Sequence, residues 1–448
     1  MFLSKFNFTR SQTRAWIKKT ATKILPRGRF ARSVAVLAGG TALGQAIVVL
    51  TSPILTRLYT PEDFGVLAVY TSILSIISVI AGLRYELAIP LPEKDEDAAN
   101  LLALSLGIVA FMGLLVGIGT WLLGAQIVRW ANASALRSYL WLLPVGVVMI
   151  GTYGVLNYWA VRKQAFTQIA RTKLNQGAGL AIAQIGLGLL KSGPLGLLIG
   201  RIVGQAAGIT TLAMLAYKKD KKALEAISPS RVRYMVARYR RFPLFSSGAA
   251  LINALGLQLP VLLLSGFYGA QVVGQFMLVQ RVFGLPLTLL GTSVSQVYLS
   301  RAAHKARADV QGLQKLFYAV AKRMAVLGSM PTIILVGAGP SLFSLVFGIE
   351  WRQAGVYAQI MAAMYLSAFV ATPLSYTFSV LERQDLSLIW NGSRLLLSAG
   401  SIYIAYKLGW NATHAVVAYS IGMLVGYSSL FLLSASAIRS KTKKEEAQ

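Results

Sequence analysis

The sequence predicts an all-α integral membrane protein whose chain crosses the bilayer twelve times. Hydrophobic residues make up 55% of the 448 residues and charged residues only 13%, whereas a typical soluble domain carries about 25% charged residues. The hydrophobic residues fall in long runs, and the run from Ala98 to Val128 contains no charge. A membrane-spanning helix needs about 20 apolar residues, so repeated runs of this kind predict a polytopic membrane protein.

Twelve apolar runs follow one another along the chain with short polar segments between them. The expected spans are residues 34–57, 64–90, 98–122, 138–160, 170–190, 195–217, 243–265, 271–298, 315–346, 354–380, 386–408 and 413–436. No cleavable signal peptide is visible. The first run starts only after Val34 and is too long for the apolar core of a signal sequence.

The basic residues predict which side of the membrane each loop occupies. Nine lie in residues 1–33 and nine in the loop 218–241, and further clusters occur near 301–323 and 439–444. All of these fall on one side of a twelve-span arrangement, and basic loops stay in the cytoplasm. We therefore expect a bacterial inner-membrane protein with both termini cytoplasmic. Topology accounts for the net charge of +29, so no nucleic acid partner is expected.

The basic loop in the middle of the chain divides the spans six and six, an arrangement typical of two-lobed transporters. The expected segments are a basic amphipathic N-terminal segment (1–33), an N-terminal lobe (34–217), a basic cytoplasmic linker (218–242), a C-terminal lobe (243–436) and a cytoplasmic tail (437–448). The N-terminal segment is expected to bind anionic phospholipids of the inner leaflet. An organellar transit peptide is the alternative for it.

A short sequence repeat, called here the echo, relates the two halves: a Tyr and a Gly recur with the same spacing. Tyr59 and Gly65 stand in the hairpin between the first and second spans, and Tyr268 and Gly274 repeat their spacing in the hairpin between the seventh and eighth. Two matched residues are also compatible with chance and ordinary turn chemistry. The echo nevertheless agrees with a chain built from two related halves.

Several kinds of chemistry are excluded by what the sequence lacks. There is no Cys and there are only two His, His304 and His414, so neither thiol chemistry nor a metal site is expected. No Walker motif is present, which argues against ATP consumption by this chain. The predicted outer loops are short and carry few acids, whereas sugar chemistry needs carboxylates or His. We therefore expect neither an enzyme nor a cofactor.

Arginines at membrane depth are the candidate functional residues. Arg281 lies about eleven residues into its span, near the middle of the bilayer, and Arg201 and Arg394 also lie within spans. A charge at this depth is costly, so it faces a cavity or a partner. The alternative for each is a structural contact between helices. Arginine binds phosphate oxygens in a bidentate manner, so these residues favour an anionic substrate.

The second span is expected to carry Arg84 and Glu86 in its inner third. Residues two apart on a helix do not face each other, so the two side chains are expected to have different partners. Glu86 alone among the fifteen acids is expected at membrane depth. It is therefore the candidate coupling residue for a proton gradient, with a plain salt bridge as the alternative.

Four stretches of the sequence resemble the O-antigen and polysaccharide flippases of the Wzx type. They are Leu55-Thr56-Arg57-Leu58-Tyr59-Thr60-Pro61-Glu62-Asp63-Phe64-Gly65-Val66, Gly82-Leu83-Arg84-Tyr85-Glu86-Leu87-Ala88-Ile89, Trp159-Ala160-Val161-Arg162-Lys163-Gln164-Ala165-Phe166 and Ser293-Val294-Ser295-Gln296-Val297-Tyr298. The first is the most specific. The basic N-terminal extension is not a typical feature of that family.

The resemblance implies the multidrug/oligosaccharidyl-lipid/polysaccharide (MOP) exporter fold, in which two six-helix lobes enclose a V-shaped central cavity. It also implies alternating access and a polyprenyl-diphosphate-linked oligosaccharide as substrate, such as an O-antigen or exopolysaccharide repeat unit. In that family, cationic cavity residues engage the diphosphate, a role that would fall here to Arg281 and Arg84. A polysaccharide polymerase and other assembly proteins would be partners.

Three alternatives remain at this point. The first is a MATE-like drug or metabolite exporter, which would need an acid within the membrane for a cationic substrate, and Glu86 is the candidate. The second is a membrane glycosyltransferase or polymerase, for which the short outer loops lack the chemistry. The third is a non-transporting membrane component of polysaccharide assembly.

Overall fold

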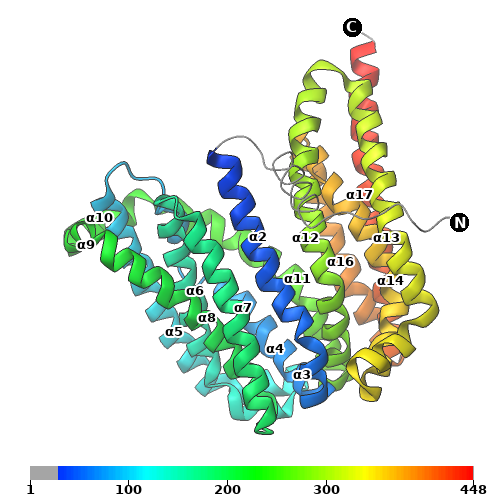
Figure 1. Ribbon diagram of the computed structural model, residues 1–448, viewed down its shortest axis with the longest axis horizontal. Helices are drawn as coiled ribbons and strands as arrows, with labels where there is room; N and C mark the ends of the chain where they lie inside the picture. Colours follow the sequence, from blue (N-terminus) through cyan, green and yellow to red (C-terminus); the bar gives the residue numbers. More distant parts are fainter. Residues whose placement is uncertain (1–28, 447–448) are drawn as a thin grey trace, which may run out of the picture.

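The computed structural model describes residues 29–446, and within this range its regular elements are all helices, without strands (Figure 1). The basic amphipathic segment predicted at 1–33 lies almost wholly outside the described residues. Its expected contact with phospholipid stays a prediction.

The N-terminal lobe is built from seven α-helices and two short 3₁₀ turns. They are α2 (Arg29–Leu50), α3 (Ser52–Leu58), α4 (Pro61–Ser78), η1 (Tyr85–Ala88), α5 (Asp95–Ala131), η2 (Ser134–Tyr139), α6 (Leu142–Arg162), α7 (Phe166–Leu189) and α8 (Pro194–Lys219). The linker follows, with α9 (Lys221–Glu225) and α10 (Pro229–Arg238).

The C-terminal lobe begins with a π-turn, η3 (Phe242–Ser246), that leads directly into its first long helix. Its elements are α11 (Ser247–Tyr268), α12 (Ala270–Ala308), α13 (Val310–Phe347), η4 (Ile349–Trp351), α14 (Arg352–Leu374), α15 (Tyr376–Val380), α16 (Gln384–Lys407) and α17 (Ala412–Glu446).

Nine helical segments among residues 29–446 are long and apolar enough to cross a membrane: α2 with α3, α5, α6, α8, η3 with α11, α12, α13, η4 to α15, and α17. Three further helices, α4, α7 and α16, pack beside them. These three helices are less apolar than the other nine segments. Helix α4 starts with two acids, and α7 and α16 carry several polar side chains. A total of twelve spans stays a prediction.

Local sequence signals explain where the hairpin between α3 and α4 turns. The Thr60 hydroxyl accepts a hydrogen bond from the Asp63 amide, and the Asp63 carboxylate accepts one from the Thr60 amide at 2.9 Å. This reciprocal capping box pairs backbone donors that the first helical turn would otherwise leave open. Pro61 takes the first helical position, where its missing N–H costs nothing.

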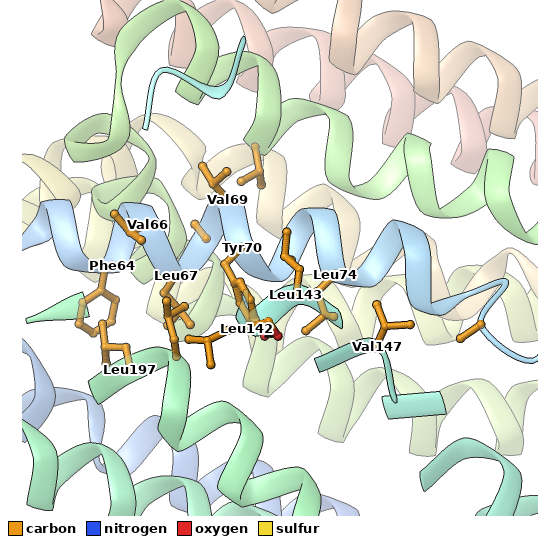
Figure 2. Close-up of a cluster of buried hydrophobic side chains, with 14 of the residues drawn as sticks. Phe64, Val66, Leu67, Val69, Tyr70, Leu74, Leu142, Leu143, Val147 and Leu197 are labelled. Atoms are coloured by element: carbon orange, nitrogen blue, oxygen red, sulfur yellow. Dashed lines mark hydrogen bonds between the residues drawn. The ribbon is translucent and has the colours of Figure 1, made fainter. Parts of the chain in front are cut away.

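The core of the N-terminal lobe lies between α4, α6 and α8 (Figure 2). Phe64, Leu67 and Leu74 of α4 are buried among Leu143 of α6 and Leu197 of α8. Within this apolar surrounding, the Tyr70 hydroxyl donates to the carbonyl of Leu142 at 2.9 Å. The bond satisfies the phenol and fixes its ring, because a buried hydroxyl without a partner is costly.

The expected second span, 64–90, is wrong at its inner end. Helix α4 stops at Ser78, and Leu83 and Arg84 adopt left-handed backbone angles (φ 47° and 63°) before η1 begins. The chain is therefore irregular where a continuous helix was expected. The expectation that Arg84 and Glu86 have different partners is also wrong, because Arg84 Nη1 lies 3.8 Å from Glu86 Oε1. The two-residue rule fails because it holds only on a helix.

The linker is not an open loop, because its helices dock on the N-terminal lobe. Met235 of α10 is buried, and the Tyr85 hydroxyl donates to the carbonyl of Val236 at 3.1 Å. The side chain of Asn100 on α5 bonds to the carbonyl of Ala226 and the amide of Ser228. These contacts hold α10 against the N-terminal part of α5 and leave its arginines exposed.

Three helices of the C-terminal lobe are longer than the expected spans. α12 runs to Ala308, α13 starts at Val310 and α17 continues to Glu446, so they project together at the top of Figure 1. A separate apolar cluster holds them together there, with Ala302 and Phe317 packed near Ile438. The three helices therefore stay packed together beyond the expected ends of their spans.

The helices gather on two sides of the molecule, with α5–α10 on the left of Figure 1 and α13–α17 on the right. The two sides approach each other at the end where α3 lies and diverge toward the end that carries α9, α10 and the C-terminal end of α17. α4 packs along α11 and α12 between them. The basic linker therefore lies at the diverging end.

Candidate functional site

Arg281 of α12 reaches across to the N-terminal lobe. The central carbon of its guanidinium lies 5.9 Å from the centre of the Phe64 ring on α4. Its Nη1 is covered and has no hydrogen-bond partner within the described chain, while the residue as a whole stays partly exposed. Arg281 stands eleven residues into α12, roughly 16 Å along the helix axis, and its mid-membrane depth stays a prediction.

Arg201 of α8 is the second arginine of this region, and it belongs to the other lobe. The two guanidinium groups lie within electrostatic range of each other, and Arg201 also lies within range of the Tyr70 phenol. The Nε of Arg201 is covered and unpaired within the described chain, and the residue remains partly exposed. The structure therefore places one arginine of each lobe at the same region of the interface.

No acid of the described chain neutralises this arginine pair. Among the ion pairs of the described residues, none involves Arg201 or Arg281. Two cations that share a poorly hydrated region repel each other, and the loss of hydration costs free energy for each of them. An anion bound between them would offset both the repulsion and the desolvation cost, and it could accept bidentate hydrogen bonds. The arrangement is suited to phosphate groups.

A cavity of about 290 Å³ adjoins Arg201 on the side of the N-terminal lobe. Its walls come from α2, α7 and α8, and Arg201 shares them with Lys173, Gln45, Gln176 and Gln205. Glycines allow the helices to meet behind it: a Cβ on Gly177 would lie 2.6 Å from the carbonyl oxygen of Gly44. The cavity is polar although it lies among membrane helices.

Sequence reasoning missed the residues that line this cavity, although a signal existed. Lys173, Gln176 and Leu180 recur at helical spacing on α7, and Arg201 and Gln205 do so on α8. Residues three and four apart share one helix face. Polar residues on one face of an apolar helix indicate an inward surface, but only the packing of α7 against α8 brings the two faces together.

Arg394 lies elsewhere in the C-terminal lobe. Its guanidinium lies 5.1 Å from the centre of the Trp390 ring on the same helix, and it is within electrostatic range of Tyr419 and Tyr427 on α17. It therefore belongs to an aromatic cluster between α16 and α17. No described contact joins it to Arg281.

Arg84 and Glu86 form a second, separate group near the predicted inner end of the N-terminal lobe. Glu86 is buried, and its Oε2 has no partner within the described chain. A Cβ on Gly82 would lie 2.5 Å from that oxygen, so the glycine makes room for the carboxylate. The predicted roles of Arg84 in substrate binding and of Glu86 in coupling stay predictions.

The lobes are joined by polar contacts at the end opposite the linker. The Arg57 guanidinium of α3 donates to the carbonyl of Val346, at the end of α13, at 3.0 Å. The Trp351 indole N–H donates to the carbonyl of Thr56 at 3.0 Å, and its ring packs edge-on against Phe64. The lobes are therefore closed at the predicted outer end.

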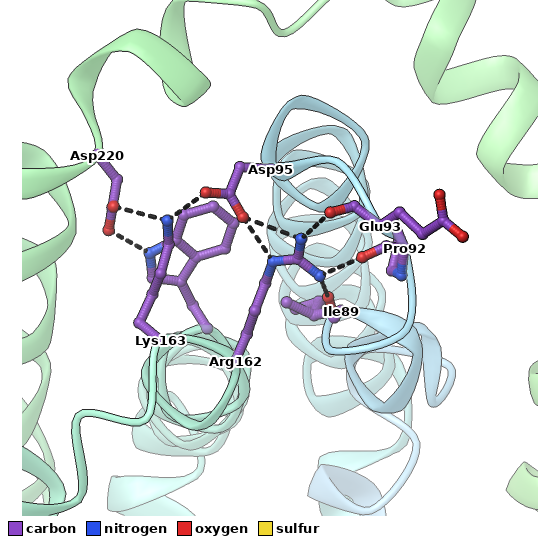
Figure 3. Close-up of polar contacts among 8 residues, drawn as sticks. Ile89, Pro92, Glu93, Asp95, Arg162, Lys163 and Asp220 are labelled. Carbon is purple, nitrogen blue, oxygen red and sulfur yellow. Dashed lines mark hydrogen bonds and ion pairs between the residues drawn. The ribbon is translucent and has the colours of Figure 1, made fainter.

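An ion-pair network lies at the opposite, predicted cytoplasmic end of the N-terminal lobe (Figure 3). Asp95 accepts from Arg162 at 2.9 Å and from Lys163 at 2.6 Å. Lys163 also contacts Asp220 at 2.8 Å, and the Trp159 indole donates to the same carboxylate. The hydrogen bond from Lys163 lowers the pKa of Asp95 below its ordinary value. The network joins α5, α6 and the end of α8.

Comparisons with known proteins agree with this architecture. The teichuronic acid biosynthesis protein TuaB of Bacillus subtilis (strain 168) is 26% identical over 187 residues, which are 42% of this chain and 38% of that protein. The succinoglycan biosynthesis transport protein ExoT of Rhizobium meliloti (strain 1021) is 24% identical over 334 residues, 73% of this chain and 63% of that protein. The chain spans less than two thirds of the length of these two relatives.

Solved structures share the fold at low identity. An inward-facing multidrug resistance MATE family transporter of the MOP superfamily matches with a TM-score of 0.73 and 16% identity, over 89% of this chain and 96% of that chain. The lipid II flippase MurJ, in an inward closed conformation, matches with a TM-score of 0.65 and 12% identity, over 89% and 86%. The two-lobed MOP fold is therefore confirmed.

These findings also confirm the resemblance to polysaccharide flippases that the first hairpin carries. The profile of the family described as polysaccharide biosynthesis protein matches residues 54–356, which include that hairpin, the arginine pair and the α7 and α8 walls of the cavity beside Arg201. The chain belongs to this polysaccharide biosynthesis protein family.

Proposed function

We propose that this protein is a flippase that moves a polyprenyl-diphosphate-linked oligosaccharide from the cytoplasmic to the outer leaflet by alternating access. The observation that carries the proposal is the pair of Arg201 and Arg281, one from each lobe, without a neutralising acid among the described residues. A diphosphate supplies oxygens for both guanidinium groups. The relatives named for polysaccharide biosynthesis and transport support this choice of substrate.

The position of the pair suits alternating access. Each arginine belongs to a different lobe, so relative movement of the lobes would change the distance between the two cations. A diphosphate that bridges them would favour the arrangement with both arginines engaged, because a ligand shifts an equilibrium by its differential affinity for the two states. In this proposal, the closure around Arg57 and Trp351 would belong to a state open toward the predicted cytoplasmic side.

The remaining parts of the proposal follow from charge. Both termini and the α9–α10 linker would lie in the cytoplasm of a bacterium, with the protein in its inner membrane. Exposed basic residues of α10 would contact anionic phospholipids, and a polymerase and other assembly proteins would take up the product. Glu86 would couple transport to protons, and no cofactor would be needed.

The fold shared with a MATE transporter favours a drug or metabolite exporter as the second candidate. An exporter of cations needs an acid near its substrate, since an embedded cation must be paired. The described acid with the greatest burial is Glu86, and its contact is with Arg84 and not with the arginine pair. The arginine pair would repel a cationic drug.

The test is a flipping assay in proteoliposomes with a fluorescent polyprenyl-diphosphate disaccharide. Arg281→Ala is expected to reduce the flipping rate at least about tenfold, because losing a hydrogen bond to a charged group weakens binding of the diphosphate by about that factor. Arg281→Lys keeps the charge without the planar fork and is expected to retain part of the rate. Arg352→Ala removes an exposed arginine of α14 as the matched control.

Arg201→Ala provides an independent check from the other lobe. It is expected to slow flipping as Arg281→Ala does, and the double variant is expected to lose less than the sum of the two losses, because both groups bind one ligand. Wild-type flipping in both single variants would overturn the proposed site. Transport of an organic cation in place of the lipid would support the exporter.

A further inference from the structure

The cavity beside Arg201 has a cation at each end. Leu180 and Lys173 of α7 both line it and are seven residues apart, roughly 10 Å along the helix axis. Arg201 lies at the Leu180 end, because its neighbour Gly200 packs against the backbone of Leu180 and the side chain of Gln184. Lys173 therefore lies about two helical turns or more from the arginine pair.

Amide side chains lie between these two cations. The Gln176 side-chain N–H donates to the Gln205 side-chain oxygen at 3.0 Å, from α7 to α8, and Gln45 completes this part of the lining from α2. Amides offer both donors and acceptors, as sugar hydroxyls require. A volume of about 290 Å³ is at the small end of ligand sites, ~300–1,000 Å³, which is suited to a single sugar.

An aromatic ring holds Lys173 in place. Its ammonium lies 4.7 Å from the centre of the Tyr153 ring on α6, and the Tyr153 hydroxyl is bonded to Thr172 at 2.9 Å, which fixes the ring. None of the ion pairs of the described residues includes Lys173. A positioned ammonium ion that borders a cavity favours an anionic group of the ligand.

We propose that this cavity holds the sugar attached to the diphosphate and that Lys173 binds a carboxylate on that sugar. The protein then prefers a lipid-linked repeat unit that begins with an acidic sugar. The inference rests on the proposed function, because Arg201 belongs both to the arginine pair and to the cavity. The distance between Lys173 and Arg201 separates the two roles: the arginines bind the diphosphate, and the lysine recognises the sugar.

The experiment compares two probes that differ in one group, polyprenyl-diphosphate glucuronic acid and polyprenyl-diphosphate glucose, with the purified full chain in proteoliposomes. At limiting lipid concentration, the wild-type protein is expected to flip the acidic lipid about tenfold faster than the neutral one. One hydrogen bond between charged groups strengthens binding by about this factor. Lys173→Gln is expected to slow the acidic lipid to the rate of the neutral one and to leave the neutral one unchanged.

Three further variants separate recognition from folding. Lys173→Arg keeps the charge and is expected to keep the preference for the acidic lipid. Gln205→Leu removes hydrogen bonds to hydroxyls that both probes share, so it is expected to slow both lipids equally. Lys191→Gln, at an exposed lysine after the other end of α7, is the matched control and is expected to change neither rate.

The outcomes distinguish this inference from the proposed function. Equal wild-type rates for both lipids, or an equal loss for both in Lys173→Gln with a wild-type melting temperature, would overturn the role of Lys173 while flipping itself stands. Failure of the wild-type protein to flip either lipid would overturn the proposed function and the inference together. If Lys173→Gln fails to fold, loss of the preference in Lys173→Arg would also contradict carboxylate binding by the lysine.

Discussion

Gly65 of α4 and Gly274 of α12 lie in reciprocal contact, each against the main chain of the other helix. A Cβ on Gly65 would collide with the carbonyl oxygen of Ala270, and a Cβ on Gly274 with that of Pro61. These glycines are the ones that repeat between the two hairpins of the sequence. The echo therefore marks the place where the two lobes meet backbone to backbone, next to the contacts of Arg57 and Trp351.

Gly274→Ala is expected to separate the lobes at the predicted outer end, because the added methyl group meets a main-chain carbonyl that cannot move aside by rotation of a side chain. The chain contains no Cys, so a single introduced thiol reports on access. Ser72→Cys lies deeper in the same interface, where Ser72 bonds to Gln258 of α11. Its labelling by an impermeant reagent from the outer side is expected to speed up in Gly274→Ala.

Gly248→Ala supplies the control for this experiment, since a Cβ there meets nothing within 4 Å. An unchanged labelling rate in Gly274→Ala would show that the crossing of α4 and α12 does not keep the outer end closed. Gly65→Ala is expected to act in the same direction, because the contact is reciprocal.

The ion-pair network around Asp95 is expected to make the stability of the folded protein depend on pH. The hydrogen bond from Lys163 lowers the pKa of Asp95 in the folded state, so the network stabilises the protein above the unfolded pKa of an aspartate, about 3.9. The stabilisation is lost as the pH falls through the folded pKa. Melting temperatures between pH 3 and pH 7 should therefore fall toward acid less steeply in Asp95→Asn than in the wild type.

Asp97→Asn is the matched control, because it removes the same charge two residues along the first turn of α5. Among the described residues, Asp97 is in no ion pair. A wild-type pH profile in Asp95→Asn would mean that the network contributes nothing to the acid dependence.

Glu86→Gln is expected to remove the dependence of flipping on a proton gradient. The carboxylate is buried with one oxygen unpaired within the described chain, and the amide has a similar shape but cannot exchange a proton. Flipping is measured in proteoliposomes with and without an imposed gradient. Glu62→Gln, at the first turn of α4, serves as the control. Unchanged transport and pH dependence in Glu86→Gln would exclude Glu86 as the coupling site.

Reporter fusions test the orientation that the basic residues predict. Fusions after residues 61, 132 and 350 are expected to report the outer side, and fusions after 225 and 440 the cytoplasm, because basic segments are retained there. The fusion after 225 is the most informative, since it follows α9 within the strongly basic linker. An outer-side signal at that position would reverse the topology and the direction of proposed transport.

The sequence by itself determined the class of protein and much of the helix order. Long uncharged runs such as Ala98–Val128 predict membrane helices because the bilayer leaves a chain few alternatives to intrahelical hydrogen bonds. Local signals such as Thr60, Pro61 and Asp63 predict the start of α4, since a cap depends on neighbours in the chain. The place of Arg281 eleven residues into its helix was also readable from the sequence.

Only the tertiary structure decided which charges meet. Arg201 and Arg281 belong to different lobes, so their proximity depends on how α8 and α12 are placed. Lys173 borders the cavity because α7 packs against α2 and α8. Arg84 pairs with Glu86 because the backbone is left-handed at Arg84. Non-glycine residues usually avoid this conformation, so packing of the surrounding chain must stabilise it. Spacing along the chain specifies a face of a helix, and packing specifies what that face meets.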